Sequence, residues 1–229
     1  MKYGQIAGNR EINYAIYRCF EHLCDEDQQR FVKKFQKQPH DSDQIMHTFR
    51  ELILGAYLSS RGFQVRYEYS VYSEAPDWCI LNKKRAVVAI VELTNFRIDV
   101  VTENEIINQM QTKGIAVYWR DANKNNVDRL YHCIWDKMQK YKPLTQKLGA
   151  PYVIGIFPDF LAGLKFEEVR ACLYSHDTGL FQMYRHVSGL LYFEEHSGQY
   201  WFRYEQNPNA LRKFDLPSGV LWLAAEQEP

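Results

Sequence analysis

The feature that most constrains the fold is a continuous run of apolar residues at 86–93, with the sequence AVVAIVEL. It is rich in Val and Ile, and such a run without polar alternation is typical of a strand in a sheet that is covered on both faces. A second run of this kind, PYVIGIF, occupies residues 151–157. Between the two, residues 126–148 carry apolar side chains at helical spacing, at Val127, Leu130, Ile134 and Met138. Strand, helix and strand in this order indicate an α/β protein.

Further predicted elements surround these two runs. Residues 63–72 alternate apolar and polar side chains, as a half-buried strand does, and residues 77–81 form a short second strand. The helix before them begins at Ser42 or Asp43 and ends at Gly62, a residue type that favours helix ends. Helices are also predicted within residues 1–40, and a β-hairpin within the C-terminal region, with strands at 189–194 and 199–204.

The length of the chain limits how these elements divide into domains. A chain of 229 residues forms one large domain or two small ones. Because no repeat or flexible linker interrupts the sequence, we predict one compact body with three parts. These are an N-terminal helical extension (1–40), an α/β core (41–160) and a C-terminal α/β part that packs on the core (161–229).

Composition excludes several classes of protein. Lys and Arg number 28, as do Asp and Glu, so no overall field attracts nucleic acid or anionic membranes. No run approaches the roughly 18 apolar residues of a membrane span, and the first residues lack the apolar segment of a signal peptide. The five cysteines are scattered, odd in number and without a CxxC pair. The cysteine pattern favours free thiols in a cytoplasmic protein. The balanced charge and the lack of an apolar span predict that the protein does not bind membranes.

Two acidic residues occupy corresponding places on the predicted strands 77–81 and 86–93. Asp77 follows Pro76 at the start of the first strand, and Glu92 lies near the end of the second. Antiparallel pairing across the turn between them would bring Asp77 and Glu92 side by side at the sheet edge. Two carboxylates and the backbone carbonyl of Leu93 are the hard oxygen ligands that Mg²⁺ prefers. Period-two alternation puts Glu92 and Thr94 on the same face of their strand.

This motif and the order of elements around it resemble the PD-(D/E)xK nuclease superfamily, which has the restriction-endonuclease-like fold. The resemblance covers about residues 43–157 and implies a mixed β-sheet flanked by helices. Asp77 and Glu92 match the acidic motif residues, and Glu51 matches the acidic residue on the helix before the strands. The resemblance implies that Glu51, Asp77, Glu92 and the Leu93 carbonyl hold Mg²⁺ or Mn²⁺. It also implies a metal-dependent nuclease that hydrolyses phosphodiester bonds of DNA.

The chain departs from the family motif at one position. The family places a lysine two residues after the second acidic residue, where this chain has Thr94. Threonine can orient a water molecule but supplies no positive charge. Some family members carry the lysine on a neighbouring helix, and on the predicted helix 126–148 we select Lys137 for this role over Lys140 and Lys142.

The basic turn between the two strands is a second candidate for contact with DNA. Lys83, Lys84 and Arg85 would suit phosphate contacts if DNA lies across the sheet edge. A solvated turn would have the same composition.

Two other interpretations remain open. The missing motif lysine and the zero net charge favour a catalytically inactive member of the same fold that binds nucleic acid, a protein partner or a second copy of itself. In the other interpretation the chain is an unrelated α/β protein, and Asp77 and Glu92 would then lie far apart.

Overall fold

The computed structural model of the chain describes residues 9–37, 42–98, 100–116, 124–159, 162–175 and 179–223. Within these residues, one mixed, curled sheet contains seven strands in chain order. The strands are β1 (Gln64–Tyr67), β2 (Trp78–Leu81), β3 (Val87–Phe96), β4 (Tyr152–Pro158), β5 (Gly189–His196), β6 (Gln199–Gln206) and β7 (Gly219–Trp222). β3, β4 and β5 are parallel, and the remaining neighbours pair antiparallel. The predicted α/β class with a mixed sheet is confirmed.

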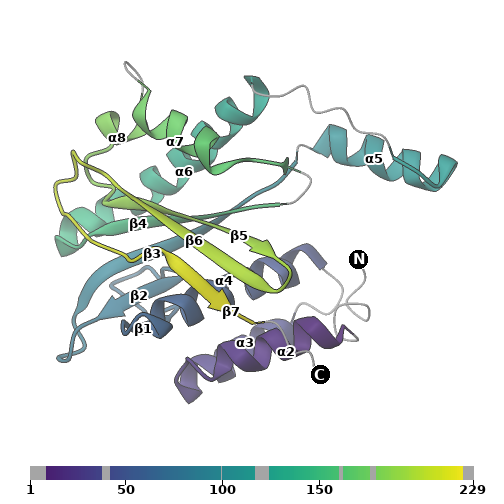
Figure 1. Cartoon of the computed structure of the whole chain (residues 1–229). Coiled ribbons are helices and arrows are strands. Elements are labelled where there is room, and N and C mark those ends of the chain that lie inside the picture. The colour runs from purple at the N-terminus through teal and green to yellow at the C-terminus, as the bar shows by residue number, and fades with distance from the viewer. Residues whose placement is uncertain are drawn as a thin grey trace.

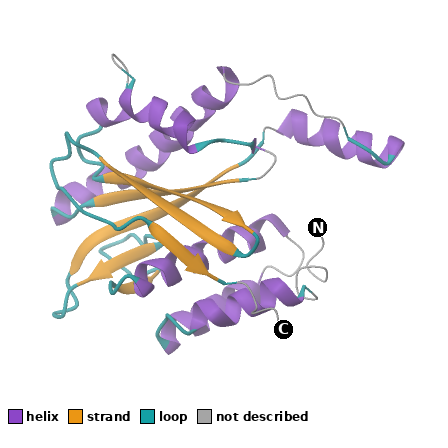
Figure 2. Cartoon of the chain, viewed as in Figure 1, coloured by secondary structure: helices purple, strands orange, loops and turns teal. Residues whose placement is uncertain are grey.

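Helices cover both faces of the sheet (Figures 1 and 2). One layer contains α2 (Arg10–Phe20), α3 (Asp25–Lys37) and α4 (Ser42–Ser60). The other contains α6 (Lys124–Leu148), α7 (Phe166–Tyr174) and the short α8 (Leu180–Met183). Helix α5 (Val100–Lys113) extends away from the body of the molecule. None of the described helices is both long and apolar enough to span a membrane.

The central strands are buried because both of their faces meet a helix layer. Along β3, Val91 and Leu93 belong to the core shared with α4, whereas Ile90 belongs to the core shared with α6. All seven residues of β4 are buried. The two apolar runs therefore form adjacent parallel strands at the centre of the sheet, joined through α6.

Some boundaries differ from the predicted ones. Helix α4 ends at Ser60, and Gly62 follows it with a positive φ of 86°, as expected of a glycine at a helix end. The strand predicted over 63–72 is shorter, because Glu68 adopts a positive φ of 44° directly after β1 and interrupts the extended backbone. The C-terminal part does more than pack on the core, since β5, β6 and β7 continue the same sheet. The predicted hairpin is β5–β6, whose turn contains Ser197 and Gly198, both with positive φ.

Candidate active site

The register of β2 against β3 brings the two acidic residues together. β2 begins at Trp78, which pairs with Val91, so Asp77 lies beside Glu92. The Asp77 backbone N–H donates to Glu92 Oε1 at 2.7 Å, and the Leu93 N–H donates to Asp77 Oδ2 at 2.8 Å. Glu92 is fully buried and Asp77 is partly exposed. The pair lies where β2 begins and not on an outer strand, because β1 pairs with the far side of β2.

Lys137 reaches this pair from α6. Its Nζ lies 2.9 Å from Glu92 Oε2, on the face of β3 that α6 covers. Burial lowers the pKa of Lys137, but the negative charges of Glu92 and Asp77 outweigh burial and raise the pKa above its ordinary value. Thr94 is buried on the same face and forms a hydrogen bond with Cys133 of α6. The structure therefore brings Asp77, Glu92 and Lys137 together around the Leu93 backbone.

The electrostatic environment of Asp77 is unfavourable to its charge. Burial has the largest effect, and the negative charges of Glu92 and Glu51 add to it, which raises the pKa of Asp77 to about 7. Lys137 and the Leu93 N–H act in the opposite direction and compensate only in part. Carboxyl groups that titrate near neutral pH are concentrated at functional sites.

Glu51 lies near this pair but belongs to a different cluster. Its Oε2 accepts hydrogen bonds from Lys34 Nζ at 2.9 Å and from the Tyr67 hydroxyl at 2.6 Å, and His47 Nε2 lies 3.1 Å from Oε1. Burial would raise the pKa of Glu51, but the His47 hydrogen bond and the charge of Lys34 lower it to about 2. Both carboxylate oxygens thus have protein donors, and a metal ion would have to displace one. We call these four residues the Glu51 cluster.

Three residues of the Glu51 cluster are absent from the sequence-based site. Lys34, Tyr67 and His47 come from α3, β1 and α4, which the sequence does not show to be neighbours. The only local signal is the spacing of His47 and Glu51, which are four residues apart on one face of α4. His47 Nδ1 also lies 2.7 Å from Asn95 Nδ2, so the cluster contacts β3 three residues after Glu92.

The basic turn does not join the site. Lys83, Lys84 and Arg85 are exposed at the opposite end of the β2–β3 hairpin, where the Asn82 N–H donates to the Ala86 carbonyl at 2.9 Å. The whole of β2 separates them from Asp77, which at about 3.4 Å per residue is roughly 14 Å. The turn is therefore no part of the acidic pair, and its contact with phosphates of DNA that lies across the sheet edge stays a prediction.

The oxygen atoms around the acidic pair suit a metal ion that is held partly by water and substrate, and not one that is held by protein ligands alone. Among the described residues, no group of three or more His, Cys, Asp and Glu side chains is arranged to hold a metal ion. An all-protein cage is therefore not present in that part of the chain. Mg²⁺, however, is commonly held by one or two carboxylates while water and substrate phosphates complete its coordination. Asp77 and the Leu93 carbonyl fit such a site, and Glu92 would join it by giving up one of its two protein donors, the Asp77 N–H or Lys137. The raised pKa of Asp77 reflects negative charge that a cation would neutralise.

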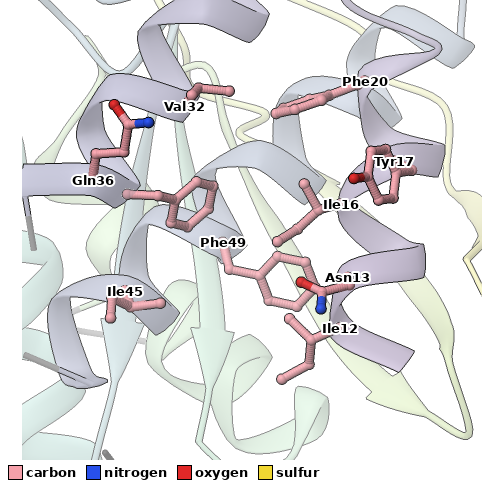
Figure 3. Close-up of a pocket in the computed structure, with 10 residues that line it drawn as sticks. Ile12, Asn13, Ile16, Tyr17, Phe20, Val32, Gln36, Ile45 and Phe49 are labelled. Carbon is pink, nitrogen blue, oxygen red and sulfur yellow. The ribbon is translucent and has the colours of Figure 1, made fainter. Parts of the chain in front are cut away.

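A groove lies elsewhere, between α2, α3 and α4 (Figure 3). Its lining is mainly apolar, and none of the residues that line it belongs to the acidic pair or the Glu51 cluster.

Comparison of the chain with protein-family models, with curated proteins and with solved structures finds no match in any of the three. The chemistry of the candidate site therefore has to be inferred from its own residues.

Proposed function

We propose that the chain is a metal-dependent nuclease that hydrolyses DNA phosphodiester bonds, with Asp77, Glu92 and Lys137 in its active site. The observation that carries the proposal is the 2.9 Å contact between Lys137 Nζ and Glu92 Oε2. This contact brings a positive charge from α6 next to the acidic pair, and Thr94 on β3 cannot supply such a charge.

The order of elements supports the same proposal. α4 with Glu51 comes first, β1, β2 and β3 follow, and α6 and β4 complete the series, with α5 inserted between β3 and α6. Apart from α5, this is the order of helix, three strands, helix and strand on which the resemblance to PD-(D/E)xK nucleases rests. The acidic residues also occupy the corresponding elements, with Asp77 at the start of β2 and Glu92 on β3.

Each side chain of the site has a role that its environment favours. Asp77, Glu92 and the Leu93 carbonyl would hold Mg²⁺ or Mn²⁺, which supplies neutralisation of phosphate charge and a lowered pKa of water. Lys137 remains protonated at neutral pH because its pKa is raised, so it acts as a cation beside the reacting phosphate and not as a base. In the reaction, a water oxygen would bond to phosphorus and release a proton to the solvent, the ester P–O bond would break, and the leaving oxygen would take up a proton from the solvent.

One observation favours the second candidate, a non-catalytic binding protein on the same fold. Both Glu92 oxygens already accept bonds from protein groups, Oε1 from the Asp77 N–H and Oε2 from Lys137. Such an arrangement is stable without metal. The two candidates differ in what metal does, because an inactive binder needs no cation for its interaction.

The test combines metal binding with cleavage. Mn²⁺ is titrated calorimetrically into the wild-type protein and Asp77→Asn, and both are assayed on supercoiled plasmid and on single-stranded DNA. We expect the wild-type protein to bind Mn²⁺ and cleave DNA, and Asp77→Asn to do neither. Metal binding without cleavage would favour the non-catalytic candidate. No heat from either protein at millimolar Mn²⁺ would exclude the nuclease.

A matched pair of lysine variants tests the role of α6. Lys137→Met should abolish cleavage, whereas Lys140→Met, which removes an exposed lysine three residues later on the same helix, should leave it unchanged. Equal effects of both variants would contradict the assignment of Lys137.

A further inference from the structure

Helix α5 stands apart from the other described helices and strands. It contains 14 residues, and none of the other described helices or strands packs along it (Figure 1). Ile107 is 46% exposed and Met110 51% exposed, and together with Ile106 they lie on one side of the helix. An isolated helix of this length is marginal in water, and most helices are stabilised by packing of an apolar face. We therefore expect the apolar face of α5 to pack against another surface.

The groove between α2, α3 and α4 is a mainly apolar hollow that none of the described residues fills, with Ile45 and Phe49 buried at its base and partly buried side chains along its walls. Its volume is about 380 Å³. Side chains from the three helices converge on it in Figure 3, and its apolar lining consists of Ile12, Ile16, Phe20, Phe35, Ile45 and Phe49. At its rim, Tyr17 is 71% exposed and Val32 42% exposed. Grooves of this kind typically receive the apolar side of a helix.

Charge makes α5 a suitable occupant of this groove. The charged residues in the second half of α3 are all basic, and two of them, Lys33 and Lys37, are exposed beside the groove residues Val32 and Gln36. α5 carries Glu103 and Glu105 in its first half. Glu103 lies on the same side of α5 as Met110, seven residues later, so a helix docked through its apolar face would bring a carboxylate toward the basic rim.

We propose that α5 of one copy of the chain docks into the α2–α3–α4 groove of a second copy, and that the exchange is reciprocal. In Figure 1, α5 extends at the level of the α6 layer, whereas α2, α3 and α4, whose residues line the groove, form the helix layer on the other side of the sheet. Within one copy, α5 and the groove therefore lie on opposite sides of the sheet, so the apolar face of α5 does not meet the groove of its own copy. A two-fold arrangement satisfies both and closes the assembly as a dimer. This inference does not depend on the nuclease activity.

Sedimentation of the full-length chain tests the proposal. The wild-type protein should be a dimer at about 100 μM, and Ile107→Glu and Val32→Glu should each weaken dimerisation at least about tenfold in Kd. Both residues are exposed, so neither variant should unfold, which circular dichroism checks. Thr112→Glu is the matched control, because Thr112 is exposed on the opposite side of α5, and it should leave the dimer intact.

Two further measurements identify the contact itself. An equimolar mixture of Ile107→Glu and Val32→Glu should recover a heterodimer, because one of its two docking sites combines an intact α5 with an intact groove. Glu103→Lys and Lys33→Glu should each weaken the dimer, and the two changes combined should restore it. A wild-type monomer at this concentration would overturn the proposal. So would a dimer that is insensitive to either Ile107→Glu or Val32→Glu, since α5 and the groove would then not be partners.

Discussion

Two buried groups of carboxylates lie close together in this molecule and have opposite electrostatic character. In the Glu51 cluster, one carboxylate has three partners, Lys34, Tyr67 and His47. In the acidic pair, two carboxylates share one cation, Lys137. The pKa of Glu51 is accordingly lowered to about 2, whereas that of Asp77 is raised to about 7.

The difference shows that burial alone does not determine what a carboxylate does. A buried charge is costly unless hydrogen bonds and opposite charges compensate for it. Around Glu51 that compensation is complete, and it links α3, β1 and α4 into one unit. Around Asp77 it is incomplete, which leaves negative charge that a cation can neutralise. We therefore interpret the Glu51 cluster as structural and the acidic pair as the functional site.

The largest effect is expected from breaking the Glu51 cluster. Glu51→Gln leaves Lys34 and His47 without their carboxylate, and removal of one member of a buried ion pair typically costs about 3–5 kcal/mol. Because Lys34 is partly exposed, we expect a loss of about 3 kcal/mol in the free energy of unfolding, measured by urea denaturation.

Glu68→Gln is the control for this prediction. Glu68 also pairs with Lys34, at 3.0 Å, but its side chain is exposed, and pairs of that kind contribute about 0–1 kcal/mol. Similar losses of unfolding free energy in Glu51→Gln and Glu68→Gln would contradict the prediction that the buried Glu51 contributes more to stability than the exposed Glu68 side chain.

Asp77→Asn should change stability in the opposite direction and raise the free energy of unfolding at neutral pH. The folded-state pKa of Asp77 lies above its ordinary value of 3.8, so its contribution to stability is fully present below pH 3.8 and is lost as pH rises through about 7. Asparagine removes the charge and can still accept the Leu93 N–H. At about 1.4 kcal/mol per pKa unit the shift corresponds to about 4 kcal/mol, and because Asp77 is partly exposed, we expect screening to reduce the gain to about 2 kcal/mol.

Urea denaturation of the metal-free proteins at two pH values measures this effect. The variant should exceed the wild-type protein in stability at pH 7.5 and match it at about pH 4. If Asp77→Asn is less stable than the wild-type protein at pH 7.5, the charge of Asp77 stabilises the fold, as that of Glu51 does, and the prediction is wrong. Loss of cleavage in a more stable protein would separate catalysis from folding, as expected where a site is strained for function.

A smaller effect is expected from Mn²⁺ itself. At a free concentration about tenfold above its dissociation constant, a ligand that binds only the folded state stabilises it by about 1.4 kcal/mol. Because protons compete for Asp77 below pH 7, the gain in melting temperature should be larger at pH 7.5 than at pH 5.5. Asp77→Asn should abolish the gain. Glu51→Gln should retain it, and an equal loss in both variants would mean that the two groups form one metal site.

The sequence predicts the acidic pair better than the Glu51 cluster, for a physical reason. Asp77 and Glu92 lie on two strands joined by a short turn, so strand pairing alone brings them together. Of the partners of Glu51, only His47 lies on the same helix, whereas Lys34 and Tyr67 come from α3 and β1, whose packing against α4 depends on the tertiary fold. Lys137 lies between these cases, because helical periodicity identifies its side of α6 but only the resemblance suggests that this side faces Glu92.

Strand β7 is an element that no pattern in the sequence predicts. β7 is four residues long and pairs only with β6 at the edge of the sheet, so its run of Gly, Val, Leu and Trp is too short for alternation to be recognised. The basic turn is a different case. Its place between the two strands follows from the sequence, whereas its contact with DNA stays a prediction.

The smallest effect is expected from a change in the basic turn of Lys83, Lys84 and Arg85, which contributes to neither carboxylate group. Both groups take their cations from helices, Lys34 from α3 and Lys137 from α6. Lys84→Ala removes a cation that is exposed and lies beyond β2, so stability should change by less than about 0.5 kcal/mol. Cleavage by Lys84→Ala should stay within about twofold of the wild-type rate, which is less than about 0.5 kcal/mol in transition-state stabilisation. A tenfold loss of cleavage at low salt that disappears at high salt would instead mean that DNA extends from the acidic pair along the whole hairpin, because contacts with phosphates weaken as salt rises.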